Sequence, residues 1–122
     1  MPNTESKGTV DFTKTVSSLE TIHEQVVHGA SYGWLTFTVG TANLSDFDVA
    51  YKAHPGGSYA TIATQASDYT SPDGPILGAS GDLASASTSG THWLHLDLRS
   101  VYSIRIQAAG TSSLIIGHFS WS

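Results

Sequence analysis

The stretch THWLHLDLRSVYSIRIQAAG, residues 91–110, decides the fold. In an extended chain, successive side chains point to opposite faces of the sheet. One alternating set reads as the core side: His92, Leu94, Leu96 and Leu98. The other set reads as the surface side: Trp93, His95, Asp97 and Arg99. This alternation predicts a strand with one buried and one solvated face.

A second strand follows after a short polar break. Its predicted inner residues are Ile104, Ile106 and Ala108, and its predicted outer residues are Ser103, Arg105 and Gln107. Two neighbouring strands with the same alternation are typical of an antiparallel sheet with one face in the core.

The same period recurs along the chain in short pieces separated by Gly, Pro, Asn, Asp and Ser. Extended segments are expected near residues 9–16, 32–40, 44–53, 58–63, 76–78 and 112–122, with Pro55, Gly56 and Gly57 turning a hairpin. Residues 44–53 place Phe47, Val49, Tyr51 and Ala53 inward and Asp46, Asp48, Ala50 and Lys52 outward. Seven to nine short strands with no convincing helix predict an all-β, single-domain, jelly-roll-like β-sandwich. The pattern alone does not separate jelly-roll from immunoglobulin-like topology, although the Cys, Trp, Cys spacing of true immunoglobulin domains is missing.

Residues 17–27 fit two structures. Ser17 and Glu20 have the spacing of a helix capping box, and Leu19, Ile22 and Val26 have helical spacing. The β-branched residues and the strand-like flanks favour an extended segment with an irregularity. We expect the extended form, with the helix as the alternative.

The composition excludes several classes of protein. The chain has 122 residues, a net charge of −5 and only 12% charged residues, against about 25% in average soluble domains. Five scattered basic residues make no basic stripe for nucleic acid. No apolar run is long enough for a membrane span, and the first residues carry no apolar core of a signal peptide. With no cysteine, the chain fits synthesis in a reducing cytoplasm. We expect an N-terminal arm at residues 1–8 and a sandwich domain at residues 9–122.

The residues predict no reaction centre and no cofactor. A strand points His92 and His95 to opposite faces, and their spacing suits neither helical nor strand metal pairs. We therefore interpret His92 as a hydrogen-bonded histidine at the core edge and His95 as a solvated residue. Asp46 and Asp48 lie on one strand face and do not face each other across a cleft. Asp68 and Asp73 are turn formers, with a weak calcium site as the alternative.

Aromatic side chains remain as binding candidates. Trp34 and Trp93 both fall on predicted outer faces, where they could anchor a protein interface or stack on sugar rings. A second layer of chain covering both rings is the structural alternative.

Taken together, several segments resemble small all-β structural proteins of tailed bacteriophages. The segments are FTVGT (37–41), FDVAYKAHPGGSYATIA (47–63), ASDYTSP (66–72), WLHLDLRSVYSIRIQAAG (93–110) and LIIGHFSW (114–121), with a Gly/Ser/Ala loop between the third and fourth. The resemblance implies a virion protein, made in the host cytoplasm, that decorates or cements the capsid over joints between capsomers, often as a trimer. Its implied partners are the major capsid protein and copies of itself. A tail, baseplate or fibre component is the second choice, and the family has no active-site residues to transfer.

The contacts with such partners are expected to involve Lys7 of the arm, Ser85 and Thr88 of the loop at residues 79–90, and the outward Trp34 and Trp93. A β-sandwich carbohydrate-binding module is the rival class, and an enzyme is a distant third.

Overall fold

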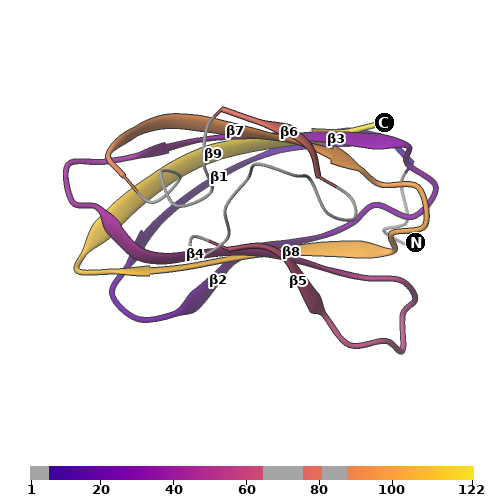
Figure 1. The fold of residues 1–122 in the computed structure, drawn as a ribbon, viewed down its shortest axis with the longest axis horizontal. Helices are drawn as coiled ribbons and strands as arrows, with labels where there is room; N and C mark the ends of the chain where they lie inside the picture. The colour runs from indigo at the N-terminus through magenta and orange to yellow at the C-terminus, as the bar shows by residue number, and fades with distance from the viewer. Residues whose placement is uncertain (1–5, 65–75, 81–87) are drawn as a thin grey trace.

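The computed structural model describes residues 6–64, 76–80 and 88–122, which form nine strands in two packed layers (Figure 1). The strands are β1 (Gly8–Val16), β2 (Glu20–Val26), β3 (Tyr32–Val39), β4 (Leu44–Lys52), β5 (Ala60–Thr64), β6 (Ile76–Ala79), β7 (Gly90–Asp97), β8 (Ser103–Gly110) and β9 (Ser113–Trp121). Within these residues, no helix is long and apolar enough to cross a membrane. The predicted all-β sandwich is confirmed.

The two sheets have five and four strands. The five-stranded sheet has the order β1-β9-β3-β7-β6, and the four-stranded sheet has the order β2-β8-β4-β5. All paired neighbours are antiparallel. With the short edge strand β6 set aside, the eight remaining strands have the order of a jelly roll, in which two Greek keys form two sheets. The alternative left open by the pattern is thus decided in favour of the jelly roll.

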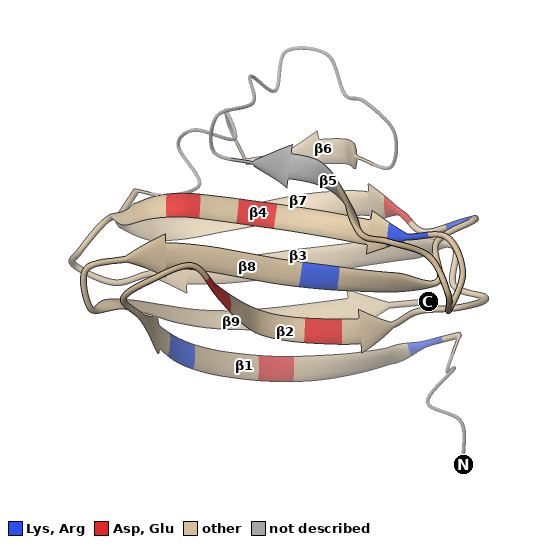
Figure 2. Cartoon of the chain, turned by 90° about the horizontal axis from the view of Figure 1, so that it is seen from below, with Lys and Arg blue, Asp and Glu red and all other residues tan. Residues whose placement is uncertain are grey.

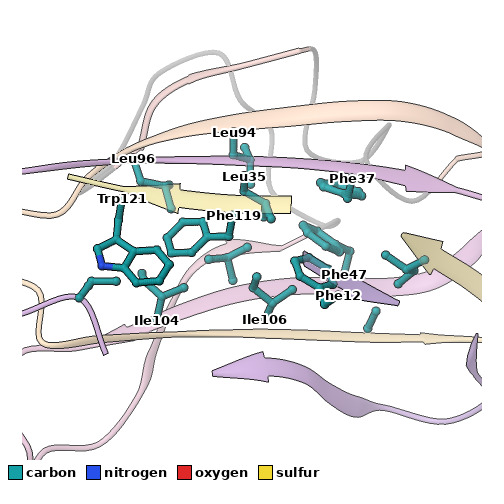
Figure 3. Close-up of a cluster of buried hydrophobic side chains, with 14 of the residues drawn as sticks. Phe12, Leu35, Phe37, Phe47, Leu94, Leu96, Ile104, Ile106, Phe119 and Trp121 are labelled. Atoms are coloured by element: carbon teal, nitrogen blue, oxygen red, sulfur yellow. The ribbon is translucent and has the colours of Figure 1, made fainter. Parts of the chain in front are cut away.

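The core lies between the sheets and consists of the inner side chains that the alternation predicts (Figure 3). Phe37 of β3 and Phe47 of β4 stack across the two layers, with ring centroids 4.5 Å apart. Leu94, Leu96 and Ile106 are each at most 1% exposed. Because burying a large apolar side chain contributes about 1.5–3 kcal/mol, these contacts dominate the stability of the sandwich.

Strand β2 confirms the extended interpretation of residues 17–27. Its pairing with β8 shifts register between Thr21 and His23, which is the expected irregularity. The Ser17 amide does donate to the Glu20 carboxylate, at 3.3 Å, but this contact spans the turn between β1 and β2. The spacing that imitates a capping box therefore serves a tight turn here.

Ser103 was predicted on the solvated face but is only 3% exposed, so that prediction is wrong. The side chain of Tyr59, from the loop between β4 and β5, lies over it. The Tyr59 and Ser103 hydroxyls share a hydrogen bond of 2.7 Å, and the Ser103 hydroxyl donates to the Gln25 carbonyl at 3.1 Å. A loop residue distant in sequence thus covers a position that alternation assigns to solvent.

Two alanines of the β4 segment also differ from the prediction. Ala50, expected outward, is only 1% exposed, beside the much longer side chain of its cross-strand partner Arg105. Ala53, expected inward, is exposed because β4 ends at Lys52.

Candidate docking face

Large apolar side chains gather on the outer face of the five-stranded sheet, which we call the apolar face. It is defined by Tyr32, Trp34, Trp93, Leu114 and Ile116, each between 36% and 50% exposed. Leu19 and Leu77 are two further large apolar side chains that are exposed. Leu77 lies in the register shift of β6, at the edge of the same sheet. An exposed cluster of this kind is typical of an interaction surface.

The aromatic side chains of this face form one cluster, centred on Trp34. The Trp34 ring stacks on His95 with centroids 4.3 Å apart and an interplanar angle of 6°. The Trp93 ring lies 5.2 Å from Trp34, and the Tyr32 ring lies 5.8 Å from His95. The register explains the cluster, because Trp34 pairs with His95 and Trp93 pairs with Thr36, which puts the two tryptophans in diagonal positions.

An open groove of about 720 Å³ lies at one end of the apolar face. Tyr32, Trp34 and His95 line it from β3 and β7, and the small side chains of Thr9 and Ser120 line it from β1 and β9. Lys7, just before β1, also lines the groove.

The edge of the buried Trp121 ring reaches the same groove beside Gly8. A Cβ at Gly8 would lie 2.5 Å from Trp121 Cζ2, so this close approach requires glycine. Gly8, the last residue of the predicted arm, is the first residue of β1 and pairs with Trp121.

Three of the five predicted contact residues lie together. Trp34 and Trp93 are neighbours on the apolar face, and Lys7 shares the groove with Trp34. Thr88 lies just before β7, at the strand end away from the groove, and its carbonyl accepts a hydrogen bond from His92. Ser85 and residues 1–5 of the predicted arm lie outside the described residues.

The two histidines of residues 91–110 differ as the alternation predicts. His92 is 9% exposed, its Nε2 donates to the Thr88 carbonyl at 2.8 Å, and its ring lies 5.4 Å from Phe37. It is the predicted hydrogen-bonded histidine at the core edge. His95 points outward but is half-buried by its stacking on Trp34, so the prediction of a simply solvated residue is wrong.

Sequence reasoning missed Leu114 and Ile116 as members of the apolar face. The signal was present in the last strand, where Ser113, Ile115, Gly117, Phe119 and Trp121 are all buried. Once Phe119 is assigned to the core, alternation sends Leu114 and Ile116 outward.

The outer face of the four-stranded sheet is different, and we call it the charged face. It carries Glu24, Asp46, Asp48, Lys52 and Arg105, and Figure 2 shows these charges on β2, β4 and β8. Tyr59 lies over this face with its ring 4.6 Å from the Arg105 guanidinium and 5.0 Å from the Lys52 ammonium. Its hydroxyl lies 3.0 Å from the Glu24 carboxylate and 2.7 Å from the Ser103 hydroxyl, so these two acceptors share its single proton.

Two carboxylates on these surfaces have shifted pKa values. Hydrogen bonds from Arg99 lower the pKa of Asp97, at the end of β7, to about 2. The shortest of these bonds runs from Arg99 Nη2 to Asp97 Oδ2, at 2.6 Å. On the charged face, partial burial and the neighbouring negative charge of Asp48 raise the pKa of Asp46.

These carboxylates do not form a metal centre in the described residues, where no three His, Asp or Glu side chains gather around one point. Asp46 and Asp48 lie side by side on β4. Asp68 and Asp73, the positions of the alternative calcium site, lie outside the described residues.

The fold of the chain is similar to that of a solved structure. No family model and no curated protein matches the sequence. Among solved structures, the chain is similar to the crystal structure of the SPBc2 prophage-derived protein YomS, with a TM-score of 0.54. The two share 10% sequence identity, and the match covers 95% of this chain and 95% of that chain. The likeness extends over the whole sandwich and shows that the two chains share a fold.

Proposed function

We propose that the protein is a structural component of a tailed-phage virion, with a non-enzymatic role as a capsid decoration protein. The observation that carries the proposal is the apolar face, which leaves five large apolar side chains more than a third exposed on one regular sheet surface. Covering such a surface with a partner removes apolar area from water, at about 25 cal/mol per Å². The fold shared with a prophage-derived protein and the sequence resemblance to phage structural proteins support the choice of partner.

The mechanism of such a protein is a shift of equilibrium. A chain that binds only the assembled head, across two or more capsid subunits, stabilises the assembled state by mass action. An interface of about 1,600 Å² suffices for specific binding, and many copies on one head add avidity. The partners are the major capsid protein and further copies of this chain.

The test is binding of the full chain to separated particles of the phage that carries its gene. DNA-filled heads and isolated tails are each incubated with labelled protein and recovered by sedimentation. Saturable binding to heads supports the decoration role. Binding to tails alone overturns it in favour of a tail or baseplate component, and binding to neither particle overturns the virion role.

The contribution of the apolar face is tested with Ile116→Asp, which places a charge at the end of the face that carries Leu114 and Ile116, and with Leu19→Asp as the matched control. Leu19 is 52% exposed and Ile116 is 50% exposed, so both are aliphatic residues of equal exposure. Only Ile116→Asp is expected to reduce head binding, by about tenfold or more, because desolvating one unpaired carboxylate costs several kcal/mol. Equal binding by both variants would show that another surface docks. Removal of residues 1–5 tests the predicted arm in the same assay, with weaker head binding expected.

A further inference from the structure

The groove beside Trp34 differs from the rest of the apolar face because it has the features of a ligand site. One face of the Trp34 ring is covered by His95, on the β7 side. The opposite face of the ring is turned toward β9, where the cross-strand partner of Trp34 is Ser120. Ser120 in turn pairs with Thr9 of β1. Two small hydroxyl side chains thus leave open the space that borders the free side of the indole ring.

The walls of this space match one kind of ligand. A pyranose ring has a face of C–H groups that packs on an indole ring, and a rim of hydroxyls that exchange hydrogen bonds with water, Ser and Thr. The groove supplies the aromatic wall in Trp34 and polar positions in Thr9, Ser120 and Ser122. Its volume of about 720 Å³ lies within the usual range of small-ligand sites.

The charge of the groove selects among saccharides. Lys7 lines it, and none of the described residues that line it is acidic, although the whole chain has a net charge of −5. Two acidic groups lie on the same sheet face: Asp97 receives two side-chain hydrogen bonds from Arg99, and Asp11 contacts His118 Nδ1 at 2.6 Å. Among the described residues, no acidic side chain pairs with the Lys7 ammonium, which can therefore meet an incoming carboxylate.

We propose that this groove binds an acidic oligosaccharide, with one uronic acid ring stacked on Trp34 and its carboxylate held by Lys7. The site gives the protein a second activity beside docking on a capsid, namely attachment to an acidic surface polysaccharide. The groove shares Tyr32 and Trp34 with the apolar face, whereas Leu114 and Ile116 do not line it.

The experiment titrates the full chain with a trigalacturonate and a glucuronate-containing tetrasaccharide, each beside its methyl ester. Binding is followed by tryptophan fluorescence and by NMR shifts of the backbone amides. We expect saturable binding of at least one acid, and an affinity for it several-fold above that of its ester. Trp34→Ala is expected to lower the affinity about tenfold or more. Lys7→Gln is expected to abolish the preference for acid over ester and the sensitivity of binding to salt.

Ile116→Ser is the matched control, since it alters the same sheet face outside the groove and should leave saccharide binding unchanged. Absence of saturable binding by either acid, or binding that Trp34→Ala leaves intact, overturns the proposal. Equal affinity for acid and ester overturns the role of Lys7. Ile116→Asp, Trp34→Ala and Lys7→Gln are each measured in both the head-binding and the saccharide-binding assay, so that failure of one proposal is distinguished from failure of the other.

Discussion

The two outer faces of the sandwich cover the same core but differ in the contacts that their large side chains make. On the charged face, Tyr59 is held by Glu24 and Ser103 through its hydroxyl and by Lys52 and Arg105 through its ring. On the apolar face the rings of Tyr32, Trp34 and Trp93 pack against one another or against His95, and these three side chains still leave more than a third of their surface in solvent. Contacts within the chain thus hold the large ring of the charged face, whereas among the described residues the apolar face keeps its large side chains exposed to solvent. The charge is thus unevenly distributed, because the charged face carries Glu24, Asp46, Asp48, Lys52 and Arg105, whereas the apolar face carries Asp11, paired with His118, and Asp97, paired with Arg99.

The comparison assumes that the two sheets unfold as one unit. Truncation of Phe37 tests this assumption and has the largest expected effect. Its ring contacts Phe47 of the opposite sheet, so Phe37→Ala leaves a cavity that both sheets border. We expect a loss of about 3–5 kcal/mol in the free energy of unfolding. Urea denaturation followed by both fluorescence and circular dichroism should show a single shared transition. Two separate transitions would show that the sheets unfold independently.

Matched tyrosine variants sharpen the comparison. Tyr59→Phe removes hydrogen bonds to Ser103 and Glu24 on the charged face and should cost about 1–2 kcal/mol. Tyr32→Phe, on the apolar face, removes a hydroxyl that makes no hydrogen bond within the described residues, and should change stability by less than about 0.5 kcal/mol. Thermal denaturation of both variants measures the difference. Equal losses would mean that Tyr59 is not specially stabilised.

Lowering the pH tests how much the Asp97–Arg99 ion pair at the end of β7 contributes to stability. Because the pKa of Asp97 is lowered to about 2, its stabilisation is present above the unfolded value of about 4. It is lost as the pH falls from about 4 to about 2. Since Arg99 is well exposed, Asp97→Asn should cost no more than about 1 kcal/mol at pH 7 and nothing below pH ~2. Denaturant midpoints across this range measure the effect, and a loss that is independent of pH would contradict it.

The smallest expected effect concerns the carboxylate pair of the charged face. Asp48→Asn removes the negative charge that helps to raise the pKa of Asp46, so that pKa should fall. Since a raised carboxyl pKa means that stability declines as the pH rises through it, the variant should be slightly more stable at neutral pH. NMR titration of the side-chain carboxyl carbons reports the pKa directly. An unchanged pKa would assign the shift to burial alone.

The alternation of side chains along each segment predicted where the strands lie, but it did not predict which strands pair. Residues 91–110 alone show which side chains enter the core, because the period of two is a property of each strand. The groove, in contrast, needs β1, β9, β3 and β7 as neighbours, in an order that skips along the chain. No local pattern places Lys7 beside Trp34, or Trp34 on His95, because these contacts arise from the register between distant strands.

The predictions that failed have the same cause. Ser103 obeys the alternation in its direction, yet a loop residue 44 positions away covers it. His95 points outward as predicted, yet Trp34, which the register places opposite it, covers one side of its ring. The local alternation determines to which face a side chain points, whereas its exposure depends on which other residues of the chain cover it.

The pairing of Gly8 with Trp121 places the first and last strands of the described fold side by side, antiparallel, with their outer ends together. A pulling force applied at these two points would load the hydrogen bonds between β1 and β9 one at a time, as in opening a zipper, because such bonds run perpendicular to the strands. The sandwich should therefore yield at low force when stretched from its ends. A load carried through the broad face of the five-stranded sheet would instead be shared by many bonds at once.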